Sequence, residues 1–293
     1  MFSEFEIFGY DVGMYAVCAL IGAAALGLFF WFQCRSPRSG QPRINFQDTV
    51  FMLIFALLGA MVGAKLMFFA TSVDVYWLAE LSFFDNIKHL IQIFVDGGLV
   101  FYGGLIGAVL GALLYVLLFK APISNMMDMG LAGVPLFHAF GRLGCFMAGC
   151  CYGVEYHGIF AVTFPENNAG GAPAGVELLP VQLIEACLNL VLWVMLTVVY
   201  RRTTRRWFTS GLYLVSYGVI RFVLEFFRGD LIRGSVFSFS SSQFISFFVV
   251  AAGILLLINP KWLDKFGGKN DEKYIEHEEQ LKKRAEERKK AKP

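Results

Sequence analysis

Charged residues are scarce in this sequence. Asp, Glu, Lys and Arg together make up 16% of the 293 residues, whereas a typical soluble domain contains about 25%. Hydrophobic residues reach 57%, and phenylalanine alone occurs 31 times. This composition excludes an ordinary soluble enzyme and predicts a polytopic membrane protein. The net charge is only +2, and the orientation of the chain in the membrane accounts for the clusters of basic residues. Nucleic acid is therefore not an expected partner.

Other common signals are also absent. The N-terminus contains Glu4 and Glu6 but no basic residue before the first apolar stretch, so we expect no cleavable signal peptide and a first span that remains in the protein. The six cysteines do not follow the C-x2-C spacing of a zinc site. The sequence contains no internal repeat or low-complexity tract.

Seven apolar segments approach or exceed the length of about 20 residues that a helix needs to cross a bilayer. They are residues 12–33, 48–70, 97–119, 126–149, 181–200, 208–227 and 242–258. The predicted fold class is therefore all-α, a polytopic membrane protein with seven transmembrane helices. A short interfacial helix is expected around residues 83–95. Gly103, Gly107 and Gly111 recur every four residues, which predicts a small-residue face for close helix packing.

The distribution of Lys and Arg between the predicted loops indicates the orientation of the chain. Basic residues number 3, 1, 4 and 11 in the segments 34–47, 120–125, 201–207 and 261–293. This pattern predicts an N-terminus outside and a C-terminus in the cytoplasm. Residues 1–260 would form the membrane domain, with a small extracytoplasmic head at about residues 150–180, and residues 261–293 would form a charged cytoplasmic tail.

A few ionisable side chains remain at membrane depth, where a charge is costly and marks a candidate functional site. Arg142 lies in the fourth predicted span, one helical turn after His138. Arg221, Glu225 and Arg228 are spaced i, i+4 and i+7 and share one face of the sixth span. Arginine can grip a phosphate with two parallel hydrogen bonds. We therefore expect the arginines of the two spans to converge on one anion, most simply a phospholipid head group.

Structural interpretations of the same residues stay open. Arg221 and Glu225 also fit an ion pair within one helix, and Arg142 also fits a side chain that extends to the membrane interface. If the anion site exists, Glu225 would orient an arginine rather than act as a base. Gln182 and Glu185 form a further polar pair at the start of the fifth span.

The cysteines at the end of the fourth span have three interpretations. Cys145, Cys150 and Cys151 lie within seven residues of one another. A cysteine inside a span is most often a small packing residue. A disulfide or redox role is the second interpretation, because the cluster should face the oxidising side of the membrane. A metal site that includes His138 or His157 is the third.

Five stretches resemble, in order, motifs of the prolipoprotein diacylglyceryl transferase family. Residues 141–153, GRLGCFMAGCCYG, resemble the family signature G-R-x-G-N-F-x-N-x-E-x-x-G. The segments that resemble its H-G-G-L-I-G, H-P-S-Q-L-Y-E, Y-G-x-x-R-F-x-x-E-x-x-R and G-Q-x-L-S motifs are residues 101–107, 180–185, 217–228 and 242–246. The resemblance extends over about residues 97–250.

The resemblance implies an activity, its substrates and a location. Members of this family transfer the diacylglyceryl group of phosphatidylglycerol to the thiol of the lipobox cysteine in a prolipoprotein. The thiolate attacks the glycerol carbon, and glycerol phosphate leaves. The implied partners are phosphatidylglycerol, a prolipoprotein signal peptide with its lipobox cysteine, and membrane lipids. The implied location is the bacterial cytoplasmic (inner) membrane, which the chain would cross several times, and no cofactor is implied.

This chain departs from the family pattern at several positions. Tyr102 stands where the family has a histidine that is often assigned to proton transfer. Cys145, Ala148 and Cys150 replace the two asparagines and the glutamate of the signature, and Leu179 replaces a histidine. Both arginines are kept. The resemblance therefore implies a preserved lipid-phosphate site whose neighbouring polar side chains are replaced by cysteines.

The resemblance also implies the site residues. Arg142, Arg221 and Tyr102 are the expected catalytic residues, with the arginines on the phosphate and Tyr102 as a polar partner or proton relay. The expected substrate-binding residues are Tyr10, Gly103, Gly104, His138, Gly144, Cys145, Gly153, Gln182, Glu185, Glu225 and Arg228. Two other functions stay open: a divergent homologue with a membrane thiol-redox role or another acceptor, and a transporter of an anionic lipid or small anion.

Overall fold

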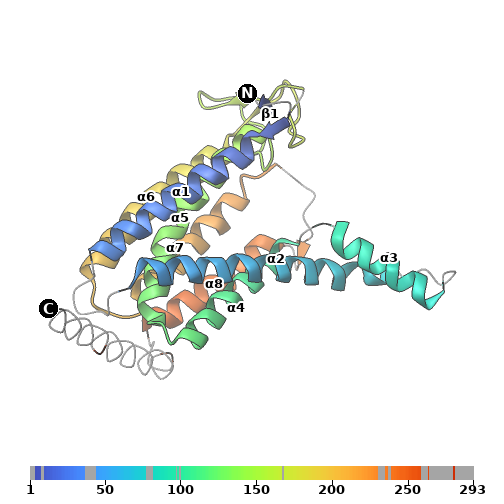
Figure 1. Ribbon diagram of the computed structural model, residues 1–293. Helices are drawn as coiled ribbons and strands as arrows, with labels where there is room; N and C mark the ends of the chain where they lie inside the picture. The colour runs from blue at the N-terminus through green and yellow to red at the C-terminus, as the bar shows by residue number, and fades with distance from the viewer. Residues whose placement is uncertain are drawn as a thin grey trace. The chain divides into compact units, whose positions relative to one another are not determined.

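The structure is a computed structural model of the chain (Figure 1). It describes residues 4–7, 10–36, 44–76, 82–96, 98, 100–166, 168–229, 235–236, 239–258, 263 and 280. Most of these residues are helical, and short antiparallel strand pairs account for part of the remainder. The chain divides into two compact units, Met1–Arg43 with Ser124–Phe266 and Ile44–Ile123 with Gly267–Pro293.

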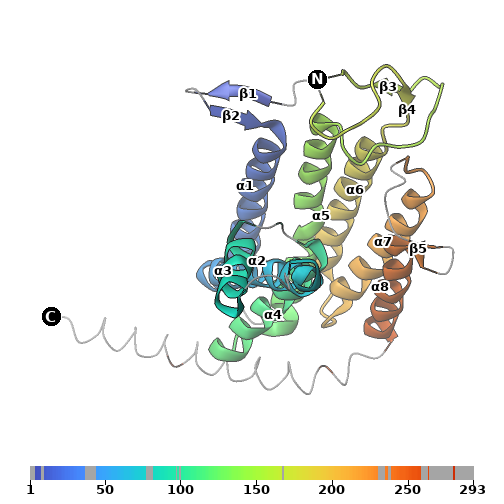
Figure 2. The same ribbon diagram turned by 90° about the vertical axis from the view of Figure 1, so that its right-hand side faces the viewer.

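The first unit is built mainly from the helices α1 (Met14–Arg35), α5 (Ile123–Ala148), α6 (Val181–Arg202), α7 (Phe208–Glu225) and α8 (Ser241–Ile258). Helix α7 packs along α8 and against α6. Helices α1, α5 and α6 run side by side (Figures 1 and 2). Gly133 on α5 allows α1 to approach closely, because a side chain there would meet Leu26 and Phe29. These contacts place the ends of α5, α6 and α7 near the same head region.

Among the described helices, five are long and apolar enough to cross a membrane. They are Met14–Arg35, Phe46–Thr71, Ile123–Ala148, Val181–Arg202 and Ser241–Ile258. The chain is therefore a mainly helical polytopic membrane protein, as the sequence predicts. Large apolar side chains such as Leu117 and Val191 are exposed, as expected where lipid covers a helix.

Two other helices coincide with predicted spans but are not among these five. Helix α4 (Phe101–Phe119) begins four residues after the predicted start at Gly97 and contains a shorter apolar stretch, Gly103–Phe119. Helix α7 carries Arg221 and Glu225 within its 18 residues. All seven predicted spans thus coincide with helices.

The second unit contains α2 (Phe46–Tyr76), α3 (Phe83–Asp96) and α4. Helix α3 confirms the short helix that the sequence predicts around residues 83–95. Tyr115 of α4 donates a hydrogen bond to Asp48 Oδ1 of α2 at 2.8 Å. This bond gives both side chains a polar contact within the protein, which lowers the cost of placing them near lipid.

Glycines bring α2 and α4 into backbone contact. A Cβ atom at Gly103 would collide with the carbonyl oxygen of Gly63, and one at Gly107 would collide with that of Gly59. Gly111 is equally tight against α2. The small-residue face predicted from the four-residue spacing is therefore confirmed, and its partner is α2.

Short strands occupy the ends of the helices. Strand β1 (Glu4–Ile7) pairs antiparallel with β2 (Tyr10–Gly13) directly before α1. Between α5 and α6, β3 (Val162–Thr163) pairs with β4 (Glu177–Leu178), and after α7, β5 (Ser235–Val236) pairs with β6 (Phe239–Ser240). In the segment between α5 and α6, Phe164, Ala172 and Leu178 form a small buried core.

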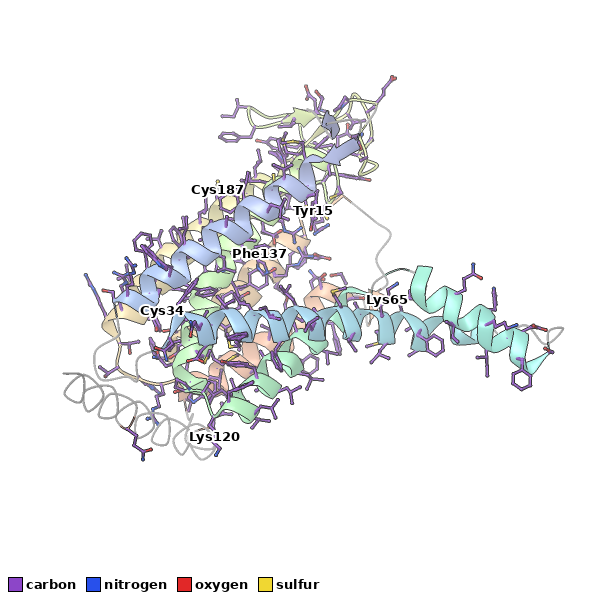
Figure 3. The ribbon with its side chains drawn as sticks, viewed as in Figure 1. Tyr15, Cys34, Lys65, Lys120, Phe137 and Cys187 are labelled. Atoms are coloured by element: carbon purple, nitrogen blue, oxygen red, sulfur yellow. The ribbon has the colours of Figure 1, made fainter. Side chains whose placement is uncertain are left out.

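Hydrogen bonds connect helices of the first unit at the ends away from the segment between α5 and α6. Asp128 of α5 is fully buried and accepts hydrogen bonds from the backbone N–H and the hydroxyl of Ser210, at 2.9 and 2.7 Å, in the first turn of α7. A carboxylate at a helix N-terminus satisfies its unpaired N–H groups. Arg201 of α6 donates to Gln33 near the end of α1, beside Cys34 in Figure 3.

Replacement of Gly107 by Ala should loosen the second unit. The added methyl group forces α2 and α4 apart, which should cost roughly 1–3 kcal/mol. Gly130→Ala is the matched control, because nothing lies within 4 Å of a Cβ there, and it should leave stability equal or slightly higher. Thermal unfolding of the two variants in detergent measures the difference. Equal melting temperatures would contradict the close α2–α4 packing.

Candidate anion-binding site

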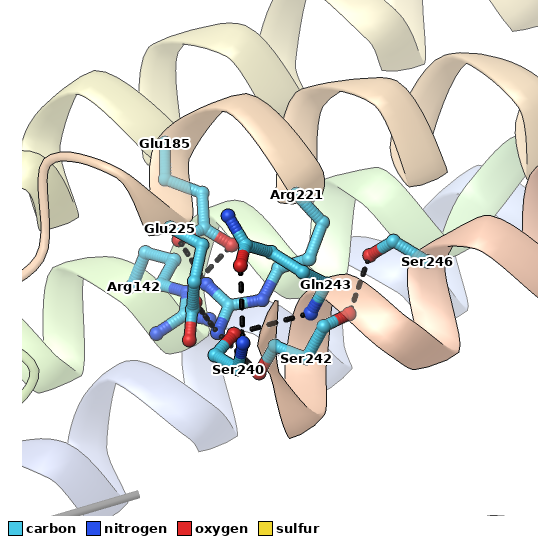
Figure 4. A network of polar contacts seen from close by, with 8 residues as sticks. All are labelled: Arg142, Glu185, Arg221, Glu225, Ser240, Ser242, Gln243 and Ser246. Carbon is cyan, nitrogen blue, oxygen red and sulfur yellow. Dashed lines mark hydrogen bonds and ion pairs between the residues drawn. The ribbon is translucent and has the colours of Figure 1, made fainter. Parts of the chain in front are cut away.

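One buried glutamate joins two arginines from different helices. Glu185 of α6 has only 2% of its side chain exposed. Its Oε1 atom lies 3.0 Å from Arg142 Nε of α5, and its Oε2 atom lies 3.8 Å from Arg221 Nη1 of α7. Figure 4 shows these side chains pointing toward one another. The two arginines therefore meet at one carboxylate, that of Glu185, and their convergence on an external anion stays a prediction.

A second glutamate fixes Arg221 along its own helix. Glu225 Oε2 lies 2.7 Å from Arg221 Nη2, at the i, i+4 spacing expected from the sequence. The same Nη2 atom donates to the hydroxyl of Ser242 on α8 at 3.1 Å. Arg221 is thus held by side chains from α6, α7 and α8, which leaves its guanidinium little rotational freedom.

The start of α8 is itself fixed by a capping box. Gln243 N–H donates to the Ser240 hydroxyl at 3.2 Å, and the Ser240 N–H donates to Gln243 Oε1 at 3.1 Å. This reciprocal pair satisfies two N–H groups at the helix start. Ser242 lies inside the capped turn, so its hydroxyl is held where Arg221 reaches it (Figure 4).

A third arginine lies near this pair. Arg228 follows α7 and lies within electrostatic range of Arg221 and of Cys151. Some of each paired arginine side chain stays exposed, 19% for Arg142 and 11% for Arg221. The cluster is therefore rich in arginine, the side chain best suited to hold a phosphate.

His138 and Gly144, two other predicted residues of α5, have packing partners. His138 is half-buried and packs against the ring of Tyr217, with 5.2 Å between ring centroids, and its buried Nδ1 atom has no hydrogen-bond partner. Gly144 lies against Tyr15 of α1. These residues support the site from the α1 and α7 sides.

The predicted residues beyond α5 hold the loop that follows it. Gln182 donates from Nε2 to the carbonyl oxygen of Cys150 at 2.8 Å. Gly153 pairs with Arg228 through the backbone, and a side chain at Gly153 would collide with the carbonyl oxygen of Leu179. Together they fix the chain that leaves the signature segment.

Four predicted residues belong to other parts of the chain. Tyr102, Gly103 and Gly104 belong to the second unit, where Gly103 packs on α2. Tyr10 lies on β2. The side chains of Tyr10 and Tyr102 lie outside the described part of the structure, so their roles stay predictions.

Two residues of the cluster were missing from the predicted site. Tyr217 lies on α7 one turn before Arg221 and beside Arg142. Its i, i+4 spacing from Arg221 is a signal that the sequence contains. The contact of Ser242 with Arg221 carries no such signal, because it joins two helices.

The three clustered cysteines meet at the end of α5. The Sγ atoms of Cys145, Cys150 and Cys151 all lie within 4.8 Å of one another. Cys150 Sγ donates to the carbonyl oxygen of Cys145 at 3.6 Å. None of the six cysteines forms a disulfide in the structure. His157, which the sequence offered as a metal ligand with them, instead pairs with glutamates in the head.

That histidine lies between two carboxylates on the exposed head. His157 Nδ1 is 2.9 Å from Glu177 Oε2, and its Nε2 atom is 3.2 Å from Glu155 Oε1. The hydrogen bond to Glu177, with the negative charge of both carboxylates, raises the pKa of His157 above its usual value. The His157 ring therefore links the segment at Glu155 to strand β4, which begins at Glu177.

The fold and the cluster define a class: a polytopic membrane protein with a buried arginine–glutamate network at the ends of its helices. The family model for prolipoprotein diacylglyceryl transferase matches residues 3–259. The chain belongs to the prolipoprotein diacylglyceryl transferase family.

This chain aligns with two relatives over most of the length of both proteins. Phosphatidylglycerol–prolipoprotein diacylglyceryl transferase 2 of Clostridium perfringens is 32% identical over 252 residues, which is 86% of this chain and 92% of the relative. The transferase of Clostridium tetani is 32% identical over 253 residues, which is 86% of this chain and 94% of the relative. The transferase of Chlorobaculum tepidum is 36% identical over a shorter 164 residues, 55% of each chain.

The pairing of His157 should make the head sensitive to pH. Because the folded pKa is raised, the stabilisation is complete below the unfolded pKa of about 6.5 and is lost as pH rises through the folded pKa. Hydrogen-exchange protection of the Tyr156 amide, which donates to Glu177 O, should therefore fall above pH 6.5 in the unmodified protein. His157→Asn should remove this pH dependence, whereas His89→Asn on α3 should keep it. An unchanged profile in His157→Asn would refute the assignment.

Proposed function

We propose that this protein transfers the diacylglyceryl group of phosphatidylglycerol to the cysteine thiol of a prolipoprotein. The observation that carries this proposal is that the buried carboxylate of Glu185 holds both Arg142 and Arg221 in a chain of this family. Its relatives are named for phosphatidylglycerol and prolipoprotein. In this proposal, Arg142 and Arg221 hold the anionic head group of the lipid.

The arginines would act on the leaving group. As the glycerol C–O bond breaks, negative charge grows on the phosphate ester, and fixed donors aimed at that charge lower the barrier. Arg142 and Arg221 are preorganised because Glu185, Glu225 and Ser242 hold them before the lipid arrives. No reorganisation is then needed during the reaction.

The remaining predicted residues have supporting roles in this proposal. Tyr10 and Tyr102 would complete the polar surroundings of the phosphate, and Tyr102 would be able to relay a proton. Gly104 would contact the lipid, whereas Gly103 packs against α2. His138 and Gln182 would keep the helix ends in place around the head group.

Arg142→Ala and Arg221→Ala should each lower the transfer rate by on the order of 10²–10³-fold, because each removes one fixed donor from the developing charge. The assay follows the mass gain of a lipobox peptide incubated with phosphatidylglycerol and the purified protein. Arg201→Ala, on the opposite end of α6 and bonded to Gln33, should retain near-normal activity. Wild-type rates in both alanine variants would contradict the proposal.

We also propose seven membrane spans with the N-terminus outside and the C-terminal tail, residues 261–293, in the cytoplasm. The membrane domain would be residues 1–260, and the segment between α5 and α6 would be its extracytoplasmic head. The distribution of basic residues supports this orientation.

Fusions to alkaline phosphatase test the orientation, because the reporter is active only outside the cytoplasm. A fusion after Gly170 in the head should be active, and one after Thr204 in the α6–α7 loop should be inactive. The reverse pattern, or equal activity at both positions, would overturn the topology.

A further inference from the structure

The three thiols beside the anion site form a ready set of metal ligands. Cys145, Cys150 and Cys151 place their Sγ atoms within 4.8 Å of one another, and each side chain is only half-buried. Thiolate sulfur is the ligand that thiophilic ions prefer. The cluster thus offers three soft ligand atoms that an ion can reach from solvent.

The backbone holds these thiols together independently of any bond between them. The chain reverses after α5 with φ of 75° at Gly149 and 59° at Cys151, a conformation that a residue with a side chain adopts only when its surroundings impose it. Cys150 N–H donates to the Cys145 carbonyl oxygen at 3.0 Å, and Gln182 holds the Cys150 carbonyl from α6. The ligand set is therefore preorganised.

The dimensions of the cluster suit a zinc ion. A Zn–S bond of about 2.3 Å in a tetrahedral site places neighbouring sulfurs about 3.8 Å apart. Small side-chain rotations bring sulfurs now within 4.8 Å to that spacing. Arg142 and Arg228 lie close enough to interact with the charges of these cysteines, so they would offset the negative charge of three thiolates on a divalent ion.

The set leaves one coordination position for an outside group. Among the described residues, no fourth His, Cys, Asp or Glu joins the three sulfurs. Zinc sites with three protein ligands and one exchangeable position are those that take part in reactions. A thiol that binds such an ion is deprotonated, and a thiolate is the nucleophilic form of cysteine.

We propose that Cys145, Cys150 and Cys151 bind one Zn²⁺ ion, and that the cysteine of the acceptor peptide takes its fourth coordination position. This inference rests on the proposed function and adds the source of the thiolate nucleophile. It also explains why the cysteines lie beside Arg142, since the nucleophile and the phosphate must meet at one glycerol carbon.

The step balances without any redox partner. The acceptor thiol binds zinc and releases its proton to water. The sulfur electron pair then forms the C–S bond to the glycerol carbon, the C–O bond to phosphate breaks, and its electron pair leaves with glycerol phosphate on Arg142 and Arg221. The product is a neutral thioether, which binds zinc more weakly than a thiolate and is therefore released.

Metal analysis of the full-length protein in detergent tests the ligand set. After incubation with zinc and removal of the excess, the unmodified protein should retain one zinc ion per chain. Cys145→Ser and Cys151→Ser should lose it. Cys187→Ser, an exposed cysteine on α6 (Figure 3), should retain it. X-ray absorption of the unmodified protein should show sulfur neighbours around the zinc, which keeps the test valid if a variant misfolds.

Cobalt substitution tests the fourth position without any transfer reaction. Co²⁺ in place of zinc gives visible bands that report its ligands. With no phosphatidylglycerol present, a lipobox peptide that contains cysteine should shift these bands, and the same peptide with serine should not. An unchanged spectrum with the cysteine peptide would overturn the role of the fourth position.

The outcomes separate this inference from the proposed function. If zinc does not bind, or if mass spectrometry of the native protein finds these thiols joined in a disulfide, the metal site is refuted even where transfer is observed. If zinc binds and the cysteine peptide shifts the spectrum but no lipid is transferred, the proposed function fails and the metal site stands. Transfer that persists at full rate after zinc removal refutes the catalytic role of the ion.

Discussion

The buried carboxylate of Glu185 is the constraint on which the first unit depends. An unpaired charge at this depth would cost several kcal/mol, so it requires cations that reach it. Arg142 and Arg221 supply them from α5 and α7, and in doing so they fix both helices to α6. Removal of Glu185 would take away the carboxylate that both arginines share. Glu225 and Ser242 hold Arg221 in addition.

The head and the loop after α5 serve this cluster rather than forming a separate structure. Gln182 and Gly153 fix the chain between α5 and α6, and Gly153 and Arg228 bring in the chain that follows α7. The reversal at Gly149 brings Cys150 and Cys151 back to Cys145 at the end of α5. The arginines and the thiols are therefore held by the same segments of the chain. A reaction between a phospholipid and a thiol requires that arrangement.

The second unit follows a simpler principle. Lipid is as apolar as the side chains of α2 and α4, so these helices gain little by hiding apolar surface from it. Glycines at four-residue intervals instead let the backbones touch, and the bond from Tyr115 to Asp48 satisfies polar groups that lipid cannot. The glycine spacing on α4 can be read from the sequence, but only the structure identifies α2 as the helix that packs against it. Tyr102 and Gly104, placed by resemblance in the catalytic site, lie in this unit.

The sequence by itself determined the helices, the glycine face of α4, the ion pair of Arg221 with Glu225, and the family. Each of these depends on residues a few positions apart, so helical periodicity is enough to find them. Only the tertiary structure decided that Glu185 joins Arg142 to Arg221, that Asp128 caps α7, and that three thiols meet. Asp128 and Ser210 are 82 residues apart, and the Glu185 links join three helices. Such pairings follow from how helices pack and turn, which local spacing does not encode.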